Sequence, residues 1–136
     1  MAATGVADAS FLVALLDRRD SYHSWAVATA AKHPPRWHTC EAVLSETFFL
    51  LGQEGKAALA ALLKRDKVSV EFKFQDEREQ VLALLKKYSS LPISLADACL
   101  VRMTETLPNP VVLTADSDFR IYRRHSRQPI PCALPR

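Results

Sequence analysis

Short apolar stretches alternate with longer amphipathic segments along the chain of 136 residues. Four of the stretches have the length and the polar flanks of strands, and they cover residues 4–7, 36–40, 68–72 and 110–115. The longer segments carry apolar residues at helical spacing, which predicts helices at about residues 10–17, 21–32, 41–51, 56–65, 75–88 and 94–106. A last strand is predicted at 128–134, weakened by two prolines. Alternating strands and helices predict an α/β domain around a mainly parallel sheet.

The length of the chain fits one domain, which we expect to span residues 1–136. A chain of this size buries enough surface to fold without disulfides or structural metals. Apolar residues make up 49% and charged residues 24%, an ordinary globular balance. The net charge of +3 is too small to indicate nucleic-acid binding by itself.

The three cysteines, Cys40, Cys99 and Cys132, are widely spaced and form no CxxC pair. This spacing disfavours a zinc site or a thioredoxin-like motif, and it suits a reducing compartment. The first nine residues contain no basic residue and no long apolar run, so we expect no signal peptide. No apolar stretch approaches the roughly 18 residues of a membrane-spanning helix. We therefore expect a cytoplasmic protein.

Four acidic residues, Asp8, Glu46, Asp97 and Asp116, lie in apolar surroundings, and Asp118 follows two residues after the last of them. Carboxylates are rarely buried unless they are paired or bound to a metal. Asp8 and Asp116 follow predicted strands, so both belong at the carboxyl edge of the sheet, where ligands bind. Local explanations exist as well: Asp8 and Asp97 can cap helices, and Asp116 can open a turn.

Glu46 is the acid that these local explanations fit least. Its helix, residues 41–51, is apolar nearly all round, which predicts a largely buried helix. No lysine or arginine occurs between Trp37 and Glu54, so a metal ion or another helix must supply the compensating positive charge. Carboxylate oxygens favour Mg²⁺ or Mn²⁺ over zinc, and the histidines lack metal-binding spacing. Such a site suits phosphoryl chemistry.

Four segments together resemble the motifs of PIN-domain ribonucleases, most closely the VapC-type toxins of prokaryotic toxin–antitoxin pairs. They read VADAS at 6–10, EAVLSE at 41–46, LADA at 95–98 and LTADSDF at 113–119. Their order and spacing fit this family over nearly the whole chain. The resemblance implies a three-layer α/β/α sandwich with a short-stranded, mainly parallel central sheet. It also implies an endoribonuclease that depends on Mg²⁺ or Mn²⁺.

The resemblance also assigns roles to individual residues. The catalytic acids would be Asp8, Glu46, Asp97 and Asp116, and the metal ligands would be Asp8, Asp97, Asp116 and Asp118. Ser10 would orient the first of these acids. The products would carry a 5′-phosphate and a 3′-hydroxyl. The expected partners are an RNA substrate, a small antitoxin protein and a second copy of the chain.

The segment 120–127 is rich in arginine and begins directly after Asp118. Arginines grip phosphates and tyrosines stack on unpaired bases, so we expect Arg120, Arg123 and Arg124 to contact RNA, with Tyr122 available for stacking. A solvated helix end is the alternative. The apolar residues of the helices between 41 and 63 are expected mostly in the core, and any exposed ones would form a groove for an antitoxin helix.

Two other functions compete with the nuclease. In a catalytically silent binding module, the acids would only cap helices and would be dispersed in the fold. In a phosphatase of the aspartyl-phosphate type, Asp116 and Asp118 would form the Asp-x-Asp motif. That motif normally follows the first strand, whereas here it lies near the end of the chain and continues into Phe119.

Overall fold

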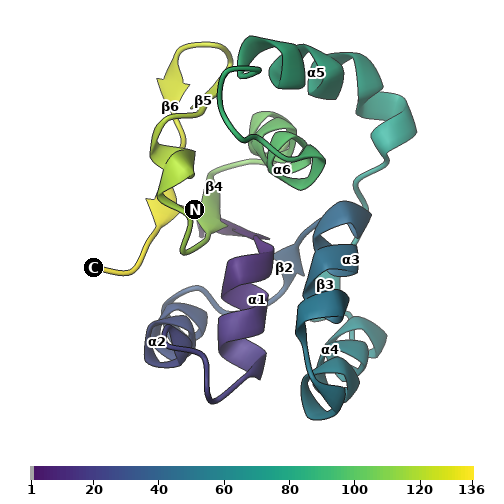
Figure 1. Cartoon of the computed structure of the whole chain (residues 1–136), viewed down its shortest axis with the longest axis vertical. Coiled ribbons are helices and arrows are strands. Elements are labelled where there is room, and N and C mark those ends of the chain that lie inside the picture. Colours follow the sequence, from purple (N-terminus) through teal and green to yellow (C-terminus); the bar gives the residue numbers. More distant parts are fainter. Residues whose placement is uncertain (1) are drawn as a thin grey trace.

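Five short strands form a parallel sheet at the centre of the computed structural model, which describes residues 2–136 (Figure 1). The strands are β1 (Thr4–Ala7), β2 (Trp37–His38), β3 (Val68–Ser69), β4 (Pro110–Leu113) and β7 (Cys132–Ala133). They lie in the order β3-β2-β1-β4-β7, with every neighbouring pair parallel. The predicted short-stranded, mainly parallel sheet is confirmed.

Six helices flank the sheet in the described part of the chain. They are α1 (Ala9–Leu16), α2 (His23–Lys32), α3 (Glu41–Leu50), α4 (Gln53–Lys64), α5 (Phe74–Lys87) and α6 (Leu95–Thr106). In Figure 1, α1 to α4 lie toward the bottom of the view and α5 and α6 toward the top, with β1 and β4 between them. The predicted α/β/α layering is therefore confirmed. Of the helices in residues 2–136, none has both the length and the apolar character needed to cross a bilayer.

The strand order reverses beside β1. The chain leaves β1 toward β2 and β3, and then crosses back to place β4 on the other side of β1. In open α/β sheets, ligands bind at such a switch point, outside the carboxyl ends of the strands. β1 and β4 pair from Thr4 opposite Pro110 to Ala7 opposite Leu113, so both strands end at the same level. The segments that leave this edge begin at Asp8 and Thr114.

The C-terminal segment differs from the single strand predicted at 128–134. A short 3₁₀ helix, η1 (Ser117–Arg120), is followed by β5 (Arg123–Arg124), which pairs antiparallel with β6 (Gln128–Pro129). The chain then turns and adds β7 to the main sheet beside β4. Pro131 has no N–H to donate, but its carbonyl accepts a hydrogen bond of 2.9 Å from Val112 N.

The expectation that the helix at 41–51 is largely buried is wrong. Only Val43 and Thr47 of α3 are buried, whereas Phe49 is 85% and Leu50 is 55% exposed. This helix packs mainly against α1 and α6, and Phe49 and Leu50 lie on the side turned away from the core. An apolar composition predicts burial only where a neighbouring element exists to provide it. Leu82 of α5 is likewise exposed.

Candidate functional site

Asp8 begins the site at the end of β1. It is the N-cap of α1, and its Oδ1 accepts a hydrogen bond of 2.8 Å from Ala9 N, as the capping explanation predicted. Its other oxygen, Oδ2, accepts hydrogen bonds from the hydroxyls of Thr114 at 2.7 Å and Ser10 at 3.2 Å. The residue is only 6% exposed. Capping therefore accounts for one oxygen, and two hydroxyl groups fix the other.

A hydroxyl network joins the segments that leave β1 and β4. Ser10 Oγ accepts a hydrogen bond of 2.9 Å from Ala115 N, and Thr114 Oγ1 accepts one of 2.9 Å from Asp116 N. Asp116 in turn caps η1, since its Oδ1 accepts from Asp118 N at 2.9 Å. The predicted contact between Ser10 and Asp8 is present. Thr114 was not predicted as part of the site, and its only sequence signal is a hydroxyl at the end of an apolar strand.

Asp97 enters the site from the first turn of α6. Its backbone N–H donates to the N-cap hydroxyl of Ser94 at 3.0 Å, as expected for the start of a helix. Its carboxylate accepts a hydrogen bond of 3.2 Å from the hydroxyl of Tyr122, and both side chains are buried. The Tyr122 ring packs edge-on against Phe119 and Tyr88. The expectation that this tyrosine stacks on an RNA base is therefore wrong, because it is a core residue that holds Asp97.

Burial and mutual repulsion raise the pKa values of three of the acids. Burial is the main reason that the pKa of Asp97 rises to about 6, and the negative charges of Asp8 and Asp116 raise it further. Burial also raises the pKa of Asp8, despite the hydrogen bonds that favour its charged form. The pKa of Glu46 is raised by partial desolvation and by Asp8 and Asp116. The four carboxylates thus act electrostatically on one another.

No positive side chain balances this charge. Within residues 2–136, the ion pairs involve other acids, namely Asp17, Asp66, Glu71, Glu77 and Glu105. Glu46 is exposed, contrary to expectation, and lies on the open side of α3. In the same described range, no three Asp, Glu, His or Cys side chains are arranged to hold a metal ion as they stand. To ligate one cation together, the carboxylates must move closer to one another.

The chemistry of the donors nevertheless fits a hard divalent cation. The groups that meet here offer carboxylate and hydroxyl oxygens, which Mg²⁺ and Mn²⁺ prefer. Burial is the largest cause of the raised pKa values of Asp97 and Glu46, and the negative charges of Asp8 and Asp116 raise them further. A bound cation would remove that penalty. Asp118 lies in the first turn of η1, two residues after Asp116, and remains a candidate ligand.

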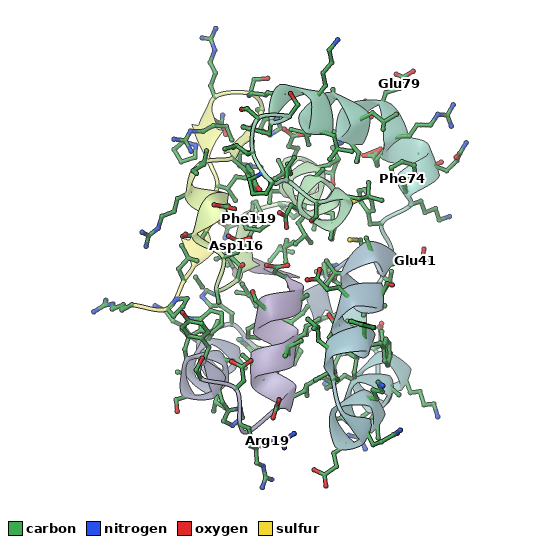
Figure 2. All side chains as sticks on the ribbon, in the orientation of Figure 1. Arg19, Glu41, Phe74, Glu79, Asp116 and Phe119 are labelled. Atoms are coloured by element: carbon green, nitrogen blue, oxygen red, sulfur yellow. The ribbon has the colours of Figure 1, made fainter. Side chains whose placement is uncertain are left out.

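The three arginines predicted to contact RNA differ in their surroundings. Arg123 donates to the carbonyls of Arg120, Ile121 and Tyr122, and Arg124 donates to the Thr104 carbonyl in the last turn of α6. A cation at this helix end also interacts favourably with the helix dipole. Arg120 is exposed and forms no such contact with its side chain. Figure 2 shows Asp116 and Phe119 at the middle of the molecule, close to where this segment begins.

The chain resembles known proteins both in its sequence and in its fold. Residues 6–124 match the family model described as the PIN domain. The fold is similar to the crystal structure of VapC20 from Mycobacterium tuberculosis, described as a toxin that cleaves the sarcin-ricin loop, with a TM-score of 0.79 and 28% sequence identity. That likeness covers 93% of this chain and 100% of the other. A comparison with curated protein sequences gives no match.

Proposed function

The chain belongs to the PIN-domain family, and from this premise we propose that it is a metal-dependent endoribonuclease that hydrolyses RNA phosphodiester bonds. One observation carries the proposal: carboxylates from the ends of β1 and β4 and from α6 repel one another, without a basic partner among the described residues. The likeness to VapC20 supports the same chemistry. A catalytically silent domain has no evident need to maintain this unfavourable arrangement of charge.

In this proposal, Asp8, Asp97, Asp116 and Asp118 hold Mg²⁺ or Mn²⁺. The cation, when bound, polarises the phosphate and stabilises the negative charge that develops during hydrolysis. The protein's own contribution is orientation, because the residues around each acid restrict its rotation. Thr114 and Ser10 hold Asp8 through its Oδ2, and the Tyr122 hydroxyl holds Asp97.

Glu46 takes a different role in the proposed reaction. Its side chain is exposed, whereas Asp8 and Asp97 are buried. Its raised pKa makes it a better base than an ordinary exposed glutamate. We therefore assign it to accepting the proton from the attacking water. The expected products carry a 5′-phosphate and a 3′-hydroxyl.

The purified protein is expected to cleave single-stranded RNA in the presence of Mg²⁺ or Mn²⁺ and to lose this activity in EDTA. Gel analysis of end-labelled RNA measures the cleavage, and treatment of the fragments with phosphatase and polynucleotide kinase identifies their ends. Ca²⁺ added after EDTA serves as a control for simple charge neutralisation. Cleavage that persists in EDTA contradicts the mechanism, and no cleavage with any divalent cation favours the silent binding module.

A small antitoxin is the proposed protein partner, with the exposed side of α3 as its docking surface. Phe49 and Leu50 lie on the same open side as Glu46, one turn or so further along the helix. A protein helix that covers these apolar side chains would also cover the approach to Glu46. Binding there would explain inhibition without a contact to every acid. The expected homodimer stays a prediction.

Replacing Phe49 with aspartate is expected to weaken the binding of the proposed antitoxin. The expected loss of affinity is at least about thirtyfold, since central aromatic residues dominate such interfaces. The RNA cleavage rate should stay unchanged, because Phe49 is 85% exposed. Titration calorimetry measures the affinity. Leu82→Asp, at another exposed apolar residue on α5, is the matched control. If Phe49→Asp instead converts a dimer to a monomer in sedimentation and leaves the affinity intact, the surface belongs to a second copy.

A further inference from the structure

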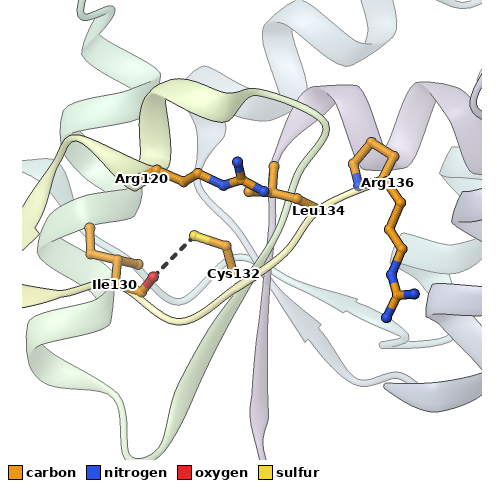
Figure 3. A pocket seen from close by; sticks show the side chains of 6 residues that line it. Arg120, Ile130, Cys132, Leu134 and Arg136 are labelled. Atoms are coloured by element: carbon orange, nitrogen blue, oxygen red, sulfur yellow. Dashed lines mark hydrogen bonds between the residues drawn. The ribbon is translucent and has the colours of Figure 1, made fainter.

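A pocket of about 390 Å³ lies beside the C-terminal strand β7 (Figure 3). We call it the tail pocket, and its lining residues are Arg120, Ile130, Cys132, Leu134, Pro135 and Arg136. Two guanidinium groups therefore share the pocket with apolar side chains. Figure 3 shows Arg120 extending from η1 toward Leu134, whereas Arg136 lies on the far side of Leu134 and its guanidinium group points away from Arg120.

The sheet register places the tail pocket next to the proposed catalytic edge. Leu113 of β4 pairs with Ala133 of β7, and Thr114 N donates to the Ala133 carbonyl at 3.4 Å. Leu134 and the residues after it therefore run past the same carboxyl edge from which Asp116 projects. Arg120 ends the short helix that Asp116 caps. The pocket and the acids are thus connected by two elements, η1 and the β4–β7 pair.

The charges in the pocket are not neutralised by the protein. Within residues 2–136, neither Arg120 nor Arg136 takes part in any of the ion pairs, which use Arg19, Arg36 and Arg102. Guanidinium groups bind phosphate oxygens with paired N–H donors. Because they are more weakly hydrated than an ammonium group, they give up less hydration when they bind a phosphate. Leu134 and Pro135 add partly exposed apolar surface that a ribose or a base can cover. The chemistry matches one nucleotide of a single strand, with an anionic and an apolar part.

We propose that the tail pocket binds a nucleotide of the RNA strand adjacent to the one being cleaved, with Arg120 and Arg136 on successive phosphates and its ribose or base on Leu134 and Pro135. This inference rests on the proposed nuclease function and extends it to the path of the substrate. The strand then runs from the acids along η1 toward β7. The acidic residues attract the negatively charged RNA backbone little. The arginines of the tail pocket provide that attraction next to the acidic site.

Binding of RNA to the Asp8→Asn protein tests the proposal without cleavage. A short fluorescein-labelled single-stranded RNA in EDTA is titrated, and its anisotropy gives the dissociation constant at several salt concentrations. When Arg120→Ala or Arg136→Ala is introduced into the Asp8→Asn protein, each should weaken RNA binding roughly tenfold, which is the scale of one charge-assisted contact. Each should also reduce the slope of log affinity against log salt by about 0.7, the value for one lost phosphate contact on a single strand.

Arg19→Ala is the matched control because it removes the same charge. Arg19 is 91% exposed and lies beyond the far end of α1 from Asp8, well away from Asp116 (Figure 2). It should change the affinity by less than about twofold. If all three variants weaken binding equally, the attraction is diffuse and the tail pocket is not a subsite. If the Asp8→Asn protein binds no RNA, the nuclease proposal itself fails.

Cys132 provides a second measurement that does not depend on removing charge. Cys40 and Cys99 are buried, whereas Cys132 lines the pocket and is partly exposed. Burial raises the pKa of its thiol to about 11, so alkylation by iodoacetamide is slow enough to follow by mass spectrometry. Bound RNA should slow this reaction severalfold in the Asp8→Asn protein. Alkylation at an unchanged rate with saturating RNA overturns the proposal.

Discussion

Replacing Asp8 with asparagine is expected to lower the RNA cleavage rate by at least about a hundredfold and to leave the fold intact. The substitution removes one negative charge from the proposed metal site and keeps the size of the side chain. Asparagine is as good an N-cap as aspartate, so the hydrogen bond from Ala9 N survives and α1 keeps its start. Single-turnover cleavage with saturating Mn²⁺ measures the chemical step.

Asp17→Asn is the control for this experiment. Asp17 lies at the other end of the same helix, next to Arg19, and has no contact with the network of Ser10 and Thr114. Its loss should leave cleavage within about twofold of the wild type. A variant of Asp8 that retains near-normal cleavage and the same thermal midpoint would remove this residue from the proposed mechanism. The nuclease function would then need a different set of acids.

Replacing Asp97 with asparagine is expected to stabilise the metal-free protein while it abolishes cleavage. The pKa of Asp97 rises from its ordinary value of 3.8 to about 6 in the folded state. Between these values the folded state binds more protons than the unfolded chain, so stability falls as pH rises through this window and levels off above about pH 6. The cost at pH 8 is on the order of 3 kcal/mol, and asparagine avoids it.

Urea unfolding in EDTA between pH 4 and pH 8 measures this effect. The wild type should lose stability across the window, whereas Asp97→Asn should lose less, and the two curves should diverge as pH rises. Asp76→Asn, an exposed carboxylate in the first turn of α5, controls for the loss of one charge. Mn²⁺ should restore stability to the wild type more than to Asp97→Asn. Parallel curves across the window contradict the electrostatic account of the site.

The parts of the site that could be predicted from the sequence are those set by local pattern. Asp8 and Asp116 follow short apolar runs, so their place at the carboxyl edge of a parallel sheet follows from strand and helix alternation alone. The start of α6 at Leu95 was equally visible, because Ser94 provides its cap. These features depend on neighbours within a few residues of each acid.

The features that could not be predicted depend on tertiary neighbours. Nothing in the sequence around Tyr122 distinguishes a buried residue that holds Asp97 from one that faces RNA, because the difference lies in its tertiary contacts with Tyr88 of α5 and Asp97 of α6. Thr114 resembles any strand-end threonine until β1 is placed beside it. The exposure of Phe49 arises because α3 turns it away from α1 and α6, the helices against which α3 mainly packs. The periodicity of apolar residues predicts a helix, but it does not indicate which side of that helix is covered by a neighbouring element.

The hydrogen bond between Thr114 and Asp8 joins residues 106 positions apart in the chain. During synthesis, Asp8 leaves the ribosome long before the segment that orients it, and β1 has no β4 beside it until residues 110–113 have emerged. A nascent chain therefore carries its first acid without the rest of the site for most of its translation. The order of synthesis therefore withholds the proposed nuclease site until β4 has been made, so the proposed activity toward RNA cannot begin on a chain that has yet to reach residue 114.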